Sequence, residues 1–189
     1  YCNYNTLFRI RKKSYEILSG SFKNKILLVP DMAFFIPVKY LRKFMAFPSK
    51  QSLYLKRIDK ELNNCNCTIE NISQDIKDWP TAQNSQFIIR LFFRFVGITD
   101  AFYLRKMFSV SEFFRKLSLF YLQWILYPYI AKTGVQFLSA YNVITVTRMH
   151  AAILAVLLNK PVNLVNNSYG KNKNFYDSWL TDLDTIHLI

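Results

Sequence analysis

The sequence predicts an α/β protein with a parallel sheet and flanking helices. Three observations support this fold class. Short apolar runs of strand length alternate with helical segments, which is typical of βαβ units. The 189 residues are 51% hydrophobic, which is enough to bury a sizeable core. The chain also has no internal repeat or low-complexity tract that would indicate a solenoid or a disordered protein.

The first predicted unit is βαβ-like and is followed by a connecting region. A short strand is expected at 6–10. The helical segment "RKKSYEILSG" follows, and Gly20 can close it as a C-cap. The apolar run "KILLVPD" predicts a buried strand that ends at Pro30, with Asp31 just beyond its end. Residues 37–50 are basic, aromatic and interrupted by prolines, which indicates a connection.

The rest of the chain predicts a second set of alternating elements after a mostly helical insertion. Residues 83–138 contain little glycine and show a long apolar periodicity, which favours helices. The other elements are predicted in this order: a strand at 52–56, a polar loop at 63–71, a second short element at 72–78, a strand at 142–146, a helix at 148–158, a strand at 161–165, a loop at 166–174 and a helix at 175–183.

The net charge of +13 favours an anionic partner such as an acidic lipid or a phosphorylated small molecule. The basic residues are scattered, and no helix-turn-helix, zinc-finger or aromatic RNA-binding signature accompanies them, so we expect no nucleic-acid partner. Cys65-Asn66-Cys67 lacks the two-residue spacer and second ligand pair typical of zinc sites, and no metal site is predicted. Three unevenly placed cysteines fit a reducing cytosol.

Two aromatic segments raise the question of membrane association. The uncharged run "LSLFYLQWILYPYI", residues 117–130, is shorter than the roughly 20 residues that a spanning helix needs. Together with "FIIRLFFRFVG", residues 87–97, it could lie on an anionic membrane surface. The alternative is a buried helix in an aromatic core. The predicted location is therefore cytoplasmic, with or without peripheral membrane association.

A candidate anion site lies where the strand at 142–146 turns into the following helix. If Thr147 is the N-cap, then Arg148, Met149 and His150 occupy the first helical positions, whose N–H groups lack helical partners. The positive end of the helix dipole favours an anion there, and the Arg148 guanidinium matches phosphate or carboxylate. In the helix itself, an apolar stripe should face the sheet: Ile153, Leu154, Leu157 and Leu158.

A second polar loop, "NNSYGK", follows the next strand and should reach the same sheet edge, because parallel strands share a direction. Its Asn167, Ser168 and Lys171 could donate hydrogen bonds to a phosphorylated or hydroxyl-rich ligand. His150 could then serve as a general acid or base. The alternative is a capping or core-edge histidine beside an ordinary turn.

The run "VITVTRMHAAILAVLLNKPVNLVNNSYGK" followed by "NFYDSWL" resembles the C-terminal part of the polysaccharide pyruvyl transferase family. Weaker similarity extends upstream through "RKKSYEIL", "LLVPDMAF", "YLKRIDKE" and Asp78-Trp79. The resemblance implies two Rossmann-like domains that face a cleft. Residues 1–48 would then be the end of an incomplete first domain with its linker, and 49–189 the C-terminal domain with a helical, aromatic region at 83–138.

The resemblance also implies an enzyme that transfers the enolpyruvyl carbons of phosphoenolpyruvate onto two hydroxyls of a cell-surface polysaccharide or its lipid-linked precursor. A pyruvate ketal would form and phosphate would leave, without a cofactor. Carried over by position, Arg148 would hold the donor, and His150 would act as acid or base. The expected substrate-binding residues are Arg57, Asn167, Ser168 and Lys171.

Family members often carry aspartate where this chain has Thr147 and Asn166. The first residue is tyrosine, so the sequence is expected to be a fragment that is inactive alone. One alternative function is a nucleotide-sugar glycosyltransferase of the same fold. Another is a non-catalytic peripheral membrane component of glycan assembly.

Overall fold

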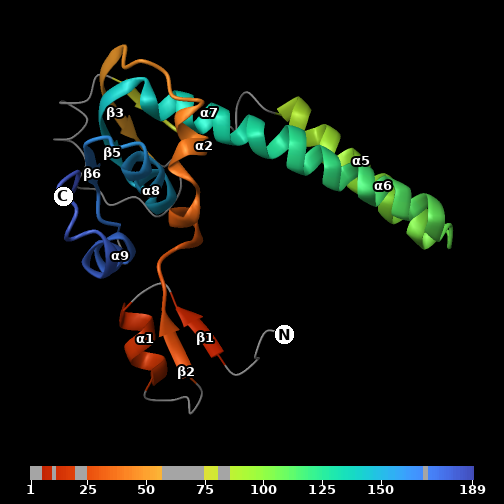
Figure 1. The fold of residues 1–189 in the computed structure, drawn as a ribbon, viewed down its shortest axis with the longest axis horizontal. Helices are drawn as coiled ribbons and strands as arrows, with labels where there is room; N and C mark the ends of the chain where they lie inside the picture. Colours follow the sequence, from red (N-terminus) through yellow and green to blue (C-terminus); the bar gives the residue numbers. More distant parts are fainter. Residues whose placement is uncertain (1–5, 10–11, 20–24, 57–74, 81–85, 168–169) are drawn as a thin grey trace. The chain divides into compact units, whose positions relative to one another are not determined.

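The computed structural model describes all residues except 1–5, 10–11, 20–24, 57–74, 81–85 and 168–169 (Figure 1). The chain divides into two compact units. Unit 1 comprises residues 1–78 together with 138–189, and unit 2 comprises residues 79–137. The elements of unit 1 contain the candidate site, whereas unit 2 is helical. The predicted domain division at residue 48 remains a prediction.

Unit 1 begins with the predicted βαβ arrangement. Strand β1 (Thr6–Arg9), helix α1 (Lys12–Ser19) and strand β2 (Lys25–Leu28) follow one another, and the two strands pair in parallel. The expected connection at 37–50 instead includes helix α2 (Val38–Arg42), which follows the short 3-10 helix η1 (Met32–Phe35). Asp31 is the N-cap of η1, and its Oδ1 accepts a hydrogen bond from the Ala33 N–H at 2.9 Å.

The main sheet of unit 1 has five parallel strands, in agreement with the predicted fold class. They are β3 (Lys50–Leu55), β4 (Asp75–Lys77), β5 (Tyr141–Val146), β6 (Val162–Leu164) and β7 (Ile186–Leu188), in the spatial order β4-β3-β5-β6-β7. This is the 2-1-3-4-5 order of flavodoxin-like sheets, whose strand order reverses between the first and third strands. Ligands of such sheets bind outside the carboxyl ends of the strands at that point, here next to β3 and β5.

The strands and helix α8 (Met149–Leu157) form the core of unit 1. Leu53 and Leu55 of β3, together with Ile144 of β5, are completely buried. Of the expected apolar stripe of α8, Ile153 and Leu158 are buried, whereas Leu154 and Leu157 are only partly buried. Three alanines, Ala151, Ala152 and Ala155, are buried beside Ile153. Their small side chains let the helix backbone lie close to its neighbours.

Helix α8 ends in a Schellman motif. Asn159 has a left-handed conformation with φ of 55°, which asparagine tolerates better than most residues. Its N–H donates to Val156 O, and the Lys160 N–H donates to Ala155 O. This ending turns the chain sharply toward Pro161 and strand β6.

Lys160 is a buried cation that stabilises the start of β5. Lys160 is only 7% exposed, and its Nζ donates hydrogen bonds to Ser139 O and Tyr141 O, both at 2.9 Å. Burial lowers the pKa of Lys160, because desolvation disfavours the charged form. Since a neutral amine still has two N–H groups, both carbonyl bonds can persist after deprotonation.

A polar cluster fixes the edge strand β4 against its neighbours. Asp75 accepts hydrogen bonds from Lys50 Nζ at 2.7 Å and from the buried Tyr141 hydroxyl at 2.6 Å, and Lys77 Nζ lies 3.1 Å from the same carboxylate. Lys50 and then Tyr141 hold the pKa of Asp75 well below its usual range, and Asp75 in turn raises the pKa of Lys50. This cluster fixes the strand that leads directly to Asp78.

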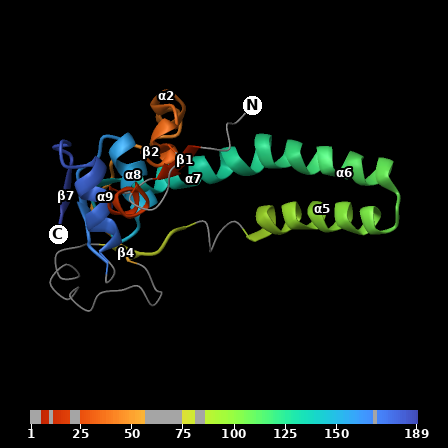
Figure 2. The ribbon, with the colours of Figure 1, turned by 90° about the horizontal axis from the view of Figure 1, so that it is seen from below.

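Unit 2 is a helical hairpin. Helix α5 (Gln86–Leu104) packs against α6 (Phe108–Tyr121), which continues through a π-helical turn, η2 (Leu122–Leu126), into α7 (Tyr127–Ser139). Figures 1 and 2 show α5 and α6 side by side. Lys106 makes the turn with φ of 61°, and a second Schellman motif forms there, with N–H bonds from Lys106 to Tyr103 O and from Met107 to Phe102 O. No helix among the described residues is long and apolar enough to cross a membrane.

Two predictions for the end of the chain were wrong. Helix α9 (Lys171–Trp179) begins four residues before the predicted position, inside the expected loop, and ends before Leu183. The sequence analysis also missed β7, which pairs with β6 at the sheet edge. Phe175 of α9 is completely buried and stacks on Phe34 of η1, with ring centroids 6.1 Å apart. This aromatic contact brings η1 to the part of the sheet where α8 and α9 begin.

Candidate active site

Arg148 lies directly beyond the carboxyl end of β5 and is held by an acidic residue from the neighbouring part of the sheet. Its Nη2 donates to Asp78 Oδ1 at 3.0 Å and more weakly to Oδ2 at 3.4 Å. Asp78 follows β4, so the contact joins residues 70 positions apart in the sequence. The pair is therefore at the strand ends where a flavodoxin-like sheet binds its ligand.

The remaining donors of Arg148 make it a candidate anion ligand. Its side chain is 35% exposed, and one edge of the guanidinium is held by Asp78. The Nε–H is buried, and among the described residues no acceptor lies within hydrogen-bonding distance. An unsatisfied buried donor is costly, and the exposed part of the guanidinium is the part that an anion can reach.

The beginning of α8 differs from the prediction by one residue. Arg148, rather than Thr147, is the N-cap, and the helix begins at Met149. Thr147 is buried, and its hydroxyl donates to Leu55 O at 3.1 Å, which joins the ends of β5 and β3. Met149, His150 and Ala151 therefore supply the first helical N–H groups, whose positive dipole end favours an anion.

His150 is at the second position of α8 and faces a carboxylate from the first half of unit 1. Its Nε2 lies 3.3 Å from Asp31 Oδ2, and the two residues are 119 positions apart in sequence. The His150 side chain is 72% exposed, whereas Asp31 is buried. When Nε2 carries the hydrogen, it donates to Asp31, and Nδ1 remains accessible for proton transfer. The arrangement is that of an orienting carboxylate behind an acid–base histidine.

Asn166 and Asn167 of the loop "NNSYGK" cap helix α9. Asn167 is buried, and its Oδ1 accepts from the Lys171 N–H at 2.6 Å and from the Asn172 N–H at 3.4 Å. Asn166 Oδ1 accepts from the Lys173 N–H at 3.2 Å. Gly170 has φ of 63°, the left-handed conformation that the turn requires. Asn166 and Asn167 thus bind the first N–H groups of α9.

The predicted convergence of the two loops is confirmed, but a different residue produces it. Asn172 is 4% exposed, and its Nδ2 donates to Thr147 O at 3.0 Å and to Val165 O at 2.7 Å. These carbonyls lie beyond the carboxyl ends of β5 and β6. Asn172 therefore joins the two strand ends beside the Arg148 backbone.

The six candidate site residues differ in their placement. Arg148 and His150 occupy neighbouring positions at the start of α8, and the Lys171 side chain is exposed at the start of α9. Arg57 and Ser168 lie outside the described residues. Asn167 lies in the predicted loop, where its oxygen caps α9. Their roles toward a substrate remain predictions.

The sequence analysis did not assign site roles to Asp31, Asp78 or Asn172. Asp31 follows a predicted strand and Asp78 ends the predicted short element at 72–78, and these positions were the available signal. Nothing local in the sequence marks Asn172, which lies in a polar run of loop-like composition. Among the described residues, no three His, Cys, Asp or Glu side chains are grouped as metal ligands, and Cys65 and Cys67 are not described.

Comparisons with known proteins identify the family of the chain. Residues 12–169 match the polysaccharide pyruvyl transferase family. The chain belongs to this family. Among curated proteins, it is 30% identical over 181 residues to a Bacillus subtilis (strain 168) protein named "Putative pyruvyl transferase EpsO", with 94% of this chain and 51% of that protein covered. The family predicted from the sequence is thus confirmed.

A solved structure similar to this pyruvyl transferase family member supports the fold. The crystal structure of a functionally uncharacterized protein from Klebsiella pneumoniae subsp. pneumoniae NTUH-K2044 superposes with a TM-score of 0.54 at 21% identity. The superposition covers 96% of this chain and 54% of that one. The chain therefore spans about half the length of both relatives.

Proposed function

We propose that the protein transfers the enolpyruvyl carbons of phosphoenolpyruvate onto two hydroxyls of a sugar in a polysaccharide or its lipid-linked precursor. The observation that carries the proposal is the start of α8. An arginine whose Nε–H has no acceptor among the described residues and an exposed histidine beside a carboxylate lie two residues apart there. This start of α8 follows the strand whose end borders the reversal of strand order.

Donor binding follows from the charge at this helix start. Phosphoenolpyruvate carries a phosphate and a carboxylate. The α8 N–H groups and the Arg148 guanidinium offer complementary donors for either group. Asp78 occupies one nitrogen of the guanidinium and fixes its plane, which orients the remaining donors. The exposed Lys171 on α9 adds a cation at the beginning of the neighbouring helix.

The reaction needs one acid and one base, and His150 can alternate between the two roles. A proton added to the methylene carbon gives a methyl group and an electrophilic central carbon. The first sugar hydroxyl attacks that carbon, the carbon–oxygen bond to phosphate breaks, and the second hydroxyl closes the ketal. The two hydroxyls lose two protons in total. One returns to His150 and replaces the proton that it gave to the methylene carbon, and the other leaves with phosphate. Asp31 stabilises the imidazolium that forms between these steps.

The test is acceptor-dependent phosphate release from phosphoenolpyruvate by the protein as the cell makes it. His150→Gln should lower kcat by about a hundredfold or more, because general acid–base catalysis typically contributes that much. Arg148→Lys keeps the charge but loses the planar fork, so it should raise KM for phosphoenolpyruvate by roughly tenfold. His187→Gln is the matched control, because His187 is exposed on β7.

Full activity of the His150→Gln variant would contradict the assigned role. Consumption of a sugar nucleotide, without phosphate release from phosphoenolpyruvate, would replace the proposal with a glycosyltransferase. Equal losses in the His150 and His187 variants would indicate a general structural effect rather than catalysis.

A further inference from the structure

Helix α6 and its continuation carry an exposed aromatic face that no described element covers. Phe113, Phe120 and Trp124 are 63%, 57% and 65% exposed, and Tyr127 is 57% exposed. With Lys116, these residues are spaced by three or four positions, which places them along one side of the helix. The Phe120 and Trp124 ring centroids are 6.4 Å apart. We call these five residues the aromatic stripe.

The same hairpin is strongly basic. Residues 86–137 contain seven lysines and arginines against two acidic residues, a net charge of +5. Glu112 accepts two hydrogen bonds of 2.6 Å from Arg115. Its negative charge is therefore paired with the positive charge of Arg115. Arg94 on α5 and Lys116 on α6 are exposed. The hairpin therefore combines large exposed aromatic rings with an excess of cations.

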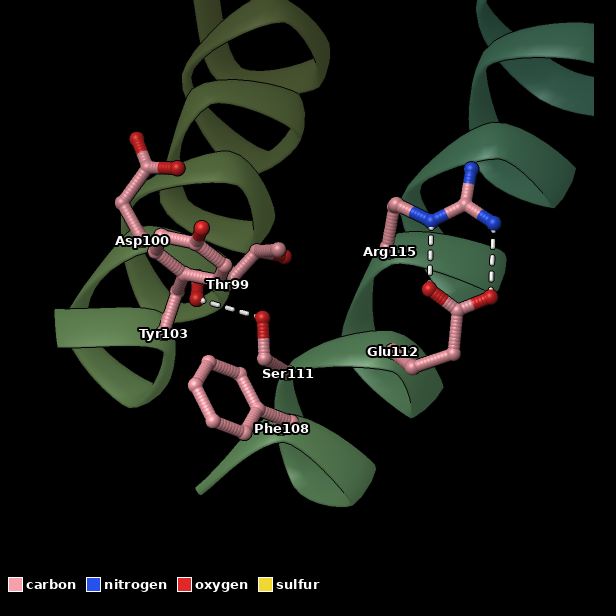
Figure 3. Close-up of a pocket in the computed structure, with 7 residues that line it drawn as sticks. All are labelled: Thr99, Asp100, Tyr103, Phe108, Ser111, Glu112 and Arg115. Atoms are coloured by element: carbon pink, nitrogen blue, oxygen red, sulfur yellow. Dashed lines mark hydrogen bonds and ion pairs between the residues drawn. The ribbon is translucent and has the colours of Figure 1, made fainter. Parts of the chain in front are cut away.

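The turn of the hairpin is tied together and holds α5 and α6 as one arm. A hollow of about 490 Å³ lies at this turn. Side chains of both helices line it (Figure 3). Ser111 Oγ donates a hydrogen bond to Thr99 O at 3.0 Å across the hollow. The Tyr103 and Phe108 rings pack edge to face, with their centroids 5.5 Å apart. The Arg115 side chain at its rim points to Glu112 (Figure 3). We therefore assign this hollow to the packing of the turn and not to a ligand.

We propose that the aromatic stripe lies flat on an anionic lipid surface. Trp, Tyr and Phe rings partition into the interface between headgroups and acyl chains, and neighbouring Lys and Arg side chains bind anionic headgroups. No described helix can cross the bilayer, so the hairpin lies on the surface and does not span it. A second copy is a poorer occupant, because it would bring two hairpins of charge +5 together.

The test is co-sedimentation of the chain with vesicles of phosphatidylcholine, alone or with roughly one lipid in three replaced by phosphatidylglycerol. Binding is expected only with the anionic vesicles and should weaken as salt is raised. The variant Phe113→Ser/Phe120→Ser/Trp124→Ser should lower the apparent partition coefficient by about tenfold or more. Arg94→Glu/Lys116→Glu should have a comparable effect by removing headgroup attraction.

The matched control is Phe47→Ser, because Phe47 is 94% exposed but belongs to unit 1. This variant should bind vesicles like the wild type. Lipids with brominated acyl chains should quench Trp124 fluorescence, and the quenching should be lost in Trp124→Phe, which keeps an aromatic ring. Circular dichroism checks that each variant retains its helices.

Failure of the wild type to pellet with anionic vesicles would overturn the proposal. A dimer in sedimentation velocity that the triple serine variant dissociates, with no lipid binding, would assign the aromatic stripe to a second copy. Neither result would affect phosphate release from phosphoenolpyruvate, so the two proposals fail independently.

Discussion

Asp31 has two separable roles because its two carboxylate oxygens have different partners. Oδ1 accepts from the Ala33 N–H at 2.9 Å and caps η1, whereas Oδ2 lies 3.3 Å from His150 Nε2. An amide oxygen can replace the first contact. An amide nitrogen in the place of Oδ2 would reverse the hydrogen bond to His150. It would donate to Nε2, whereas the carboxylate oxygen accepts from it, and this favours the tautomer with the hydrogen on Nδ1. At the scale of single residues, Asp31 can therefore be tested for positioning His150 without loss of the cap.

We predict that Asp31→Asn lowers kcat by about tenfold or more and leaves KM for phosphoenolpyruvate nearly unchanged, because donor binding rests on Arg148. Its free energy of unfolding should match that of the wild type. Asp31→Ala should lose activity and, in addition, about 1 kcal/mol of stability with the lost cap. Steady-state kinetics and urea unfolding of the two variants separate the effects. If Asp31→Asn had full activity, the carboxylate would have only the capping role.

Among the elements, helix α9 begins where it does because of its capping side chains. Asn166 and Asn167 accept the N–H groups of Lys171, Asn172 and Lys173, so the polar run after β6 winds into a helix early. That beginning brings Asn172 to the carbonyls of Thr147 and Val165. The capping loop thus sets the position of the strand ends that border the site.

We predict that Asn167→Ala lowers the free energy of unfolding by about 1 to 2 kcal/mol, because buried N–H groups of α9 lose their acceptor. Asn167→Asp should be as stable as the wild type or more so, since a carboxylate accepts the same bonds and favours the positive helix end. Urea unfolding monitored by circular dichroism measures both changes. A ligand role carried by the Asn167 side-chain N–H groups would appear differently, as a higher KM in a stable Asn167→Asp variant.

Local sequence signals predicted the strands of the sheet because apolar runs bounded by prolines and polar residues have few other solutions. They failed at α9, where side-chain caps convert a loop-like composition into a helix. They also failed at β7, whose three residues include the exposed His187 and show no clear pattern. Edge strands depend on their neighbour for pairing, so their own sequence specifies them weakly.

The candidate site was predictable in part for a related reason. Arg148 and His150 were found because they lie at a helix start, a local feature of the sequence. Their partners Asp78 and Asp31 are 70 and 119 residues away, and no periodicity or spacing reports contacts of that range. Tertiary structure, through the polar cluster at Asp75 and the Phe34–Phe175 stack, determines both pairs.

At the scale of the whole molecule, the two units divide the proposed tasks. Unit 1 contains the groups proposed for donor binding and proton transfer, and unit 2 contains the aromatic stripe. The site residues Arg148 and His150 and the stripe share no contact partner among the described interactions. Substitutions in the two units should therefore act independently, as sites without shared partners usually do.

We predict that the triple serine variant of the aromatic stripe loses activity only when the acceptor is in a membrane. With a lipid-linked glycan in anionic vesicles, its rate at low acceptor concentration should fall by about tenfold, because surface binding raises the local concentration of enzyme at its substrate. With a water-soluble glycan acceptor, kcat and KM should equal those of the wild type. His150→Gln should instead lose activity with both acceptors. A triple variant equally impaired on the soluble acceptor would show that the stripe supports the fold or the active site rather than the membrane.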